Sequence, residues 1–123
     1  MIIKGLVETG KGPVEIAELA AGDKVLDRMH RPRKVLAVEA KEVSGGFAFA
    51  KNPGLILAKE STLKTLYGDV ALTGDTDISM LLPTSRRVQD SAKSIDGTYT
   101  AYAVTIEDAD ALYVSQYCVK AGT

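Results

Sequence analysis

Residues 5 to 28, GLVETGKGPVEIAELAAGDKVLDR, constrain the fold of this chain more than any other stretch. An extended apolar run that opens at Leu6 is broken at Gly10 to Pro13, where glycine permits backbone angles that other residues avoid and proline fixes its own. Val14 and Ile16 then return with the two-residue spacing of a strand. A compact turn over Glu18 to Asp23 leads into another strand. The stretch therefore predicts short strands joined by tight turns.

The rest of the chain repeats this pattern of short apolar runs and turn residues. Further strands are predicted at Val35 to Ala40, Phe47 to Ala50, Leu55 to Ala58, Ser61 to Tyr67, Val70 to Thr73, Ile78 to Leu82, Tyr99 to Ile106 and Leu112 to Val119. Breaks are predicted at Ser44 to Gly46 and at Asn52 to Gly54, and the polar segment Pro83 to Gly97 reads as a loop that could include a short helix. The sequence predicts an all-β fold of about eight to eleven short strands with little or no helix.

Composition narrows the possible functions. The chain has 123 residues, enough for a single domain over residues 1–123, and its 15 basic and 16 acidic residues leave a net charge of -1. That balance gives no long-range field for nucleic acid or an anionic membrane. No apolar run is long enough for a signal peptide or a membrane span, so we expect a soluble protein made in the cytoplasm. One cysteine and one histidine argue against a disulfide or a Cys- or His-based metal site, and we expect no cofactor.

The opening stretch resembles the start of the Hint domain, the fold shared by inteins and hedgehog autoprocessing domains. The residues that fit the Hint pattern in order are Gly5, Val7, Thr9, Gly12, Val14, Ile16, Glu18, Leu19, Gly22, Asp23, Val25 and Leu26. The last two predicted strands, with an acidic turn between them, also look like the end of a Hint domain. The resemblance covers the first forty residues well and the last twenty-five fairly well, and it implies a Hint-like β fold.

The same resemblance implies where Hint chemistry would lie. Hint domains rearrange a peptide bond with a Cys or Ser nucleophile at the first position, and a Thr-x-x-His motif polarises that bond. Here the nucleophile position is Met1, and the motif is matched to Thr73-Gly74-Asp75-Thr76. Inteins add a terminal His-Asn pair, which falls near Lys120-Ala121-Gly122. Only the threonine is retained, so we predict no catalytic residues and no enzymatic activity.

Other candidate residues have simpler interpretations. Cys118 lies in an apolar run and is predicted to be a small buried hydrophobe rather than a reactive thiol. His30 lies in the basic turn Arg28 to Lys34, which reads as a solvated loop rather than a phosphate site, while the sequence leaves open whether the turn contacts another chain. A pairing of His30 with Cys118 would require the fold to bring them together. Gly45-Gly46 lacks the context of a phosphate-binding loop and reads as a turn.

Two acidic clusters and a set of tyrosines complete the candidates. Asp69, Asp75 and Asp77 could offer oxygens to a cation, and so could Glu107, Asp108 and Asp110. Neither cluster has the ligand spacing of a calcium loop, so side-chain-capped turns explain both, and we predict no metal site. The four tyrosines in the last two predicted strands would suit an interface if some face outward; they are Tyr99, Tyr102, Tyr113 and Tyr117.

These observations favour a non-catalytic structural or interaction module. The expected partners are proteins: further copies of the chain, or subunits of a larger assembly such as a virus or phage particle, where it would be a decoration, neck or tail component. The alternative is Hint-type autoprocessing with atypical residues, which would need a hydroxyl nucleophile such as Thr9 or Ser79. A carbohydrate-binding domain ranks last, because the chain has no Trp to form a binding platform.

Overall fold

The computed structural model describes residues 1–122 and is built almost entirely from β-strands. Twelve strands form one antiparallel sheet that curls back on itself, with a single 3-10 turn, η1 (Ile16–Glu18). The predicted all-β fold is confirmed. Within the described residues, no helix has the length and apolar character needed to cross a membrane.

The strands follow one another with short connections. In chain order they are β1 (Ile2–Lys4), β2 (Leu6–Thr9), β3 (Gly12–Glu15), β4 (Lys24–Leu26), β5 (Pro32–Phe49), β6 (Asn52–Leu57), β7 (Thr62–Thr65), β8 (Gly68–Ala71), β9 (Thr76–Leu81), β10 (Arg87–Ile106), β11 (Ala111–Val114) and β12 (Tyr117–Lys120). Ten of them have six residues or fewer. The exceptions are β5 and β10, with 18 and 20 residues, which pair along most of their length.

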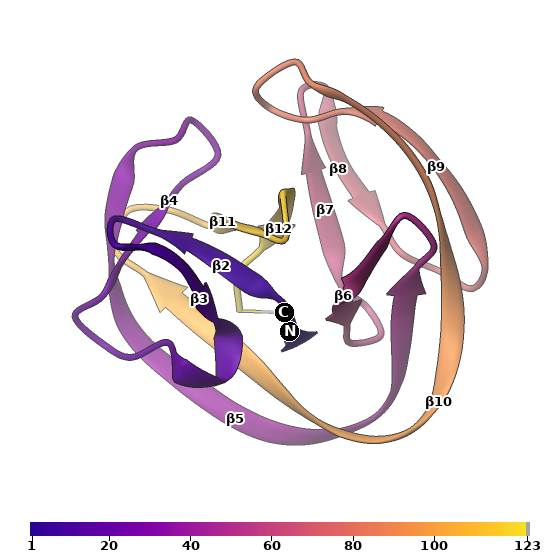
Figure 1. Cartoon of the computed structure of the whole chain (residues 1–123), viewed down its shortest axis with the longest axis horizontal. Coiled ribbons are helices and arrows are strands. Elements are labelled where there is room, and N and C mark those ends of the chain that lie inside the picture. Colours follow the sequence, from indigo (N-terminus) through magenta and orange to yellow (C-terminus); the bar gives the residue numbers. More distant parts are fainter. Residues whose placement is uncertain (123) are drawn as a thin grey trace.

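The two long strands form the frame of the molecule. Figure 1 shows β5 and β10 sweeping together around one edge, from the side that carries β2, β3 and β4 to the side that carries β7, β8 and β9. A register shift between Ile95 and Thr98 interrupts their pairing at the bend. Gly45 and Gly97 have φ values of 72° and 120°, which glycine adopts at little cost. The bend therefore occurs where two glycines allow it.

A single core fills the space between the two sides. Its fully buried members come from both, and include Val7 and Val25 on one side and Leu57 and Leu63 on the other. The sheet order is β8-β7-β12-β11-β2-β4-β5-β6-β1-β10-β9, so the C-terminal hairpin β11–β12 connects β2 to β7. The N-terminal strand β1 lies between β6 and β10. Both ends of the chain thus lie inside the sheet.

The predicted loop over Pro83 to Gly97 is wrong, because β10 begins at Arg87 and contains no helical turn. Val88, Asp90 and Ala92 are buried in alternation, which is the period of a half-buried strand. The pattern was missed because an aspartate occupies one of the inward positions.

Two predicted breaks also differ from the structure. β5 continues through Ser44 to Gly46, because Gly45 bends the strand without ending it. β6 already begins at Asn52, so the preceding turn is at Ala50 and Lys51 rather than at Asn52 to Gly54.

Candidate functional site

Met1 stands at the position where the resemblance places the Hint nucleophile, and residues 58 and 61 contact its carbonyl oxygen. The backbone N–H of Ala58 donates to the Met1 carbonyl oxygen over 3.0 Å. The hydroxyl oxygen of Ser61, which is fully buried, lies 3.2 Å from the same oxygen and 2.6 Å from the Ala58 carbonyl. A hydroxyl has one proton, so Ser61 donates to one of these carbonyls at a time. Ala58 and Ser61 are thus the groups placed to polarise the Met1 carbonyl.

The turn matched to the Thr-x-x-His motif lies elsewhere. The Thr76 hydroxyl donates to the Thr73 carbonyl over 3.1 Å, in the exposed turn between β8 and β9. Asp75 fastens this turn to β10 by accepting the Ser94 N–H over 2.8 Å. The four-residue segment beside Met1 is instead Ala58 to Ser61. Spacing alone could not show that Ala58 and Ser61 contact the Met1 carbonyl, and the matching of the motif to residues 73 to 76 stays a prediction.

His30 and Cys118 are brought into one neighbourhood by Tyr113. The His30 ring meets the Tyr113 ring edge-on, with centroids 4.4 Å apart, and Tyr113 pairs with Cys118 across β11 and β12. The Tyr113 hydroxyl donates to the Arg28 carbonyl over 2.9 Å. Burial raises the pKa of the Cys118 thiol to about 12, so the thiol stays protonated at neutral pH. The prediction of a small buried hydrophobe at Cys118 is confirmed, and His30 is exposed, as predicted, with its ring against that of Tyr113.

The basic turn is organised around one buried carboxylate, Asp27. Its side chain accepts hydrogen bonds from the backbone N–H groups of Met29 and Arg31, over 2.9 and 2.8 Å, and from the Arg33 guanidinium over 2.9 Å. Burial alone would raise the pKa of Asp27, but these hydrogen bonds outweigh it and hold the pKa below its ordinary value of 3.8. The turn is mostly exposed, as predicted for a solvated loop, and two of its arginines are directed at Asp27.

One carboxylate from each acidic cluster, Asp69 and Asp110, contacts the same ammonium group, that of Lys64. Lys64 is 7% exposed, and its Nζ lies 3.1 Å from an Asp69 carboxylate oxygen and 2.9 Å from one of Asp110. The hydrogen bond to Asp110 is the largest cause that raises the pKa of Lys64, and the same bond lowers the pKa of Asp110. Among the described residues, no group of three His, Cys, Asp or Glu side chains is arranged to hold a metal.

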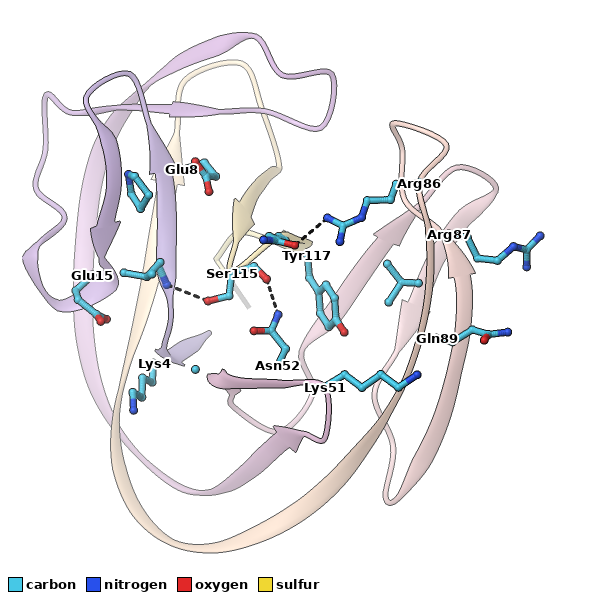
Figure 2. A pocket seen from close by; sticks show the side chains of 15 residues that line it. Lys4, Glu8, Glu15, Lys51, Asn52, Arg86, Arg87, Gln89, Ser115 and Tyr117 are labelled. Carbon is cyan, nitrogen blue, oxygen red and sulfur yellow. Dashed lines mark hydrogen bonds between the residues drawn. The ribbon is translucent and has the colours of Figure 1, made fainter.

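A groove of about 560 Å³ opens between the two sides of the molecule. Figure 2 shows Lys4, Glu8 and Glu15 on one wall, formed by β2 and β3 and the end of β1, and Lys51 and Arg86 on the other. Arg87 and Gln89 lie at the outer edge of that second wall, with their side chains extending away from it. Asn52, Ser115 and Tyr117 lie between the walls. The groove was not predicted from the sequence, because its two walls and its floor come from distant parts of the chain.

The floor of the groove is a strained hairpin turn. Ser115 and Gln116, between β11 and β12, have φ values of 45° and 74°, a region that side chains other than glycine seldom adopt. Four hydrogen bonds hold the turn in place. The Leu6 N–H donates to the Ser115 hydroxyl over 3.1 Å, and the Ser115 N–H donates to the Leu6 carbonyl over 2.8 Å. Asn52 donates to the Ser115 carbonyl, and Arg86 donates to the Gln116 side chain over 2.8 Å. The surrounding side chains thus fix the strained conformation.

Beneath the turn lies a buried polar pair, Asp90 and Tyr117. The Tyr117 hydroxyl donates to one Asp90 oxygen, and the other oxygen accepts the N–H of Lys51 over 2.8 Å. Burial, followed by the hydrogen bond to Asp90, raises the pKa of Tyr117 far above its ordinary value. Asp90 therefore ties the turn that carries Lys51 to β10 and β12. Its alternation with Val88 and Ala92 was the signal that could have revealed it.

Solved structures with this architecture are inteins. The chain superposes on the gp41-1 intein with a TM-score of 0.71 and 16% identity, over 96% of this chain and 94% of the intein. It matches the MchDnaB-1 intein with a TM-score of 0.72 and 14% identity, over 97% and 98% of the two chains. A DnaB intein from Synechocystis sp. PCC 6803 gives 0.71 and 14%, over 99% of each chain.

The chain therefore has the Hint fold, the fold of autoprocessing domains such as inteins, and the resemblance seen in the sequence is confirmed at the level of structure. No protein-family model matches the sequence, and no curated protein matches it.

The prediction that the chain is not an enzyme is corrected by these comparisons. The inteins that share its fold are self-splicing, and nothing in the structure shows that this chain is inactive. The prediction relied on the absence of particular residues from expected positions.

Proposed function

We propose that this chain is a Hint-fold interaction module that holds a segment of another polypeptide in the groove between its two walls. The observation that carries the proposal is the groove itself, whose volume of about 560 Å³ lies within the range of binding sites. Strained, well-supported backbone such as that of Ser115 and Gln116 is found preferentially at ligand sites. The narrower expectation of a virus or phage particle as the partner is a more specific form of this proposal, and the proposal does not depend on it.

Site-specific photocrosslinking tests the proposal. A photoreactive amino acid replaces Gln89, which lines the groove, or Glu42, an exposed residue of β5 outside it. The full-length chain is crosslinked in the cells that make it, and the adducts are identified by mass spectrometry. We expect a defined polypeptide, either a second copy or another protein, to be captured from position 89 and not from position 42. Equal capture from both positions, or none from position 89, would overturn the proposal.

The contacts of the Met1 carbonyl support a second candidate, Hint-type autoprocessing. The Ala58 N–H and the Ser61 hydroxyl approach that carbonyl as donors do in an oxyanion hole. Attack by water would place a hydroxyl on the Met1 carbonyl carbon and release Ile2 as a new amino terminus. The products are a chain that begins at Ile2 and a carboxylic acid that ends at Met1.

Intact-mass measurement tests this second candidate. The purified protein is incubated beside the variant Ser61→Ala, and both are followed over time. We expect a species that begins at Ile2 to accumulate faster in the parent protein than in the variant. A mass that stays constant in both proteins, or cleavage at equal rates, would exclude a role for the Ser61 hydroxyl in autoprocessing.

A further inference from the structure

The walls of the groove differ in charge. The wall built by β1 to β3 has one lysine and two carboxylates, for a net charge of -1, and the wall built by β10 and the turn before β6 has three cations and no carboxylate. The charged residues of the first wall are Lys4, Glu8 and Glu15, and those of the second are Lys51, Arg86 and Arg87. Because the whole chain has a net charge of only -1, this second wall is a local concentration of positive charge.

The cations of the second wall have no carboxylate partners in the part of the chain that the structure describes. The ion pairs found there involve Arg31, Arg33 and Lys64 instead. Arg86 is hydrogen-bonded to a neutral amide, that of Gln116. These cations are therefore available to an anionic ligand without breaking an existing ion pair.

The cationic wall is also held in position before any ligand arrives. The backbone of Lys51 is bound to buried Asp90, and Asp90 is in turn bound to Tyr117. Arg86 is fixed by Gln116 in the strained turn. A ligand would not need to order this part of the site, which lowers the entropic cost of binding.

An apolar contact lies beside the charges. Leu6 is 43% exposed and lines the groove, following Lys4 and preceding Glu8 at the two-residue spacing that places strand residues on one face. A ligand that matches both walls would therefore carry carboxylates toward the cationic wall and an apolar group toward Leu6.

We propose that the groove binds an acidic, extended polypeptide segment, with its carboxylates on Lys51 and Arg86 and an apolar side chain on Leu6. This inference rests on the proposed interaction function and names the chemistry of the partner. A nucleic acid fits less well, because Glu8 and Glu15 would repel phosphates from the opposite wall. The Tyr117 ring is buried and packs edge-on against Phe49, so it offers no stacking surface to a base.

Fluorescence anisotropy with three short labelled peptides tests the proposal. One peptide has glutamates flanking a single leucine, the second has glutamine in place of every glutamate, and the third has lysine. Each is titrated with the full chain at low and moderate salt, and a single-stranded DNA oligonucleotide is titrated alongside. We expect the glutamate peptide to bind more tightly than the other three probes, with an affinity that falls as salt is added.

Charge reversals locate the binding. Lys51→Glu is expected to weaken binding of the glutamate peptide about tenfold, because it removes one attraction and adds one repulsion. Lys41→Glu makes the same change of charge on exposed β5, outside the groove, and is expected to leave binding within about twofold of the parent protein. Thermal unfolding confirms that the variants are folded.

The outcomes separate this inference from the function on which it rests. Equal affinity for the glutamate and glutamine peptides, tighter binding of the oligonucleotide, or equal losses in Lys51→Glu and Lys41→Glu would overturn the acidic-segment inference. If position 89 still captures a defined polypeptide in those cases, the interaction function stands with a partner of different chemistry. If position 89 captures nothing and no peptide binds, both fail together.

Discussion

Asp27 and Lys64 are two buried charges that this fold accommodates in different ways. They are 4% and 7% exposed. Asp27 is held by partners two, four and six residues further along the chain, two of which are backbone amides. Lys64 is held by Asp69, five residues away, and by Asp110, 46 residues away. The first is a local arrangement and the second joins separate strands.

The difference determines which groups lose their hydrogen-bond partner when each charged side chain is removed. The amide partners of Asp27 are backbone groups that cannot move away, so its loss leaves part-buried donors without their acceptor. The partners of Lys64 are carboxylates that are 45% and 62% exposed, so water can replace the ammonium group. A buried charge is therefore costlier to remove when its partners are fixed backbone groups than when they are exposed side chains.

The largest effect is expected for Asp27→Ala. The substitution leaves two backbone N–H groups and the Arg33 guanidinium without their acceptor, and we expect it to destabilise the fold by about 3 to 5 kcal/mol. Urea unfolding measures the change. Arg31→Ala removes an exposed partner of the same carboxylate and is the matched control, with an expected cost below about 1 kcal/mol. Equal destabilisation by Asp27→Ala and Arg31→Ala would contradict the distinction between fixed backbone partners and exposed side-chain partners.

A smaller loss is expected when both partners of Lys64 are removed. The double variant Asp69→Ala/Asp110→Ala leaves the ammonium buried without a counter-charge, and we expect a cost of about 2 to 3 kcal/mol, because the flexible lysine can reach water in part. Urea unfolding of the double and single variants would show whether the stability lost in the double variant exceeds the sum of the losses in the two single variants. A double variant as stable as the parent protein would mean that Lys64 needs no partner.

A still smaller effect is expected for Lys64→Met. A methionine of similar volume fills the buried site, and both carboxylates are free to hydrate, so we expect a change of less than about 1 kcal/mol. Thermal unfolding at neutral pH measures it. A loss as large as that of Asp27→Ala would contradict the argument that exposed partners make a buried charge dispensable.

The pH dependence of these small differences sharpens the comparison. The folded pKa values of Asp27 and Asp110 lie below 3.8, so their contributions are present above that pH and are lost as the pH falls through the folded pKa. The folded pKa of Lys64 lies above 10.5, so its contribution is present below that pH and is lost as the pH rises through the folded value.

Two variants distinguish the acid and alkaline pH ranges in which these contributions are lost. The stability difference between the parent protein and Asp27→Asn should shrink only in acid, and the difference from Lys64→Met should shrink in acid and again above about pH 10.5. Denaturation midpoints across the pH range measure both. A difference for Lys64→Met that stays constant into strong alkali would show that the ammonium contributes nothing through its charge.

Much of the fold could be predicted from short-range patterns. The alternation of Val14 with Ile16 and the glycines on either side predicted the opening strands, and the structure has β2, β3 and η1 there. Burial of Cys118 followed from its apolar neighbours. The start of β10 was missed because Asp90 occupies an inward position. Its hydrogen-bond donors, the Tyr117 hydroxyl and the Lys51 N–H, are distant in sequence, so nothing near Asp90 indicated that its buried carboxylate would be hydrogen-bonded. Conversely, the threonines at 73 and 76 had a familiar spacing, whereas no pattern in the sequence indicated that Ala58 and Ser61 contact the Met1 carbonyl.

The sequence by itself determined the strands, the tight turns between them and the Asp27 turn, because the atoms involved are at most a few residues apart and local geometry places them. Only the tertiary structure decided that Ser61 meets Met1, that Asp110 meets Lys64, and that β2, β10 and the β11–β12 turn enclose one groove. These contacts between distant residues depend on strand register and on the bend at Gly45 and Gly97. Register is set by the whole sheet at once, because a shift of one residue would turn every side chain of a strand to the opposite face.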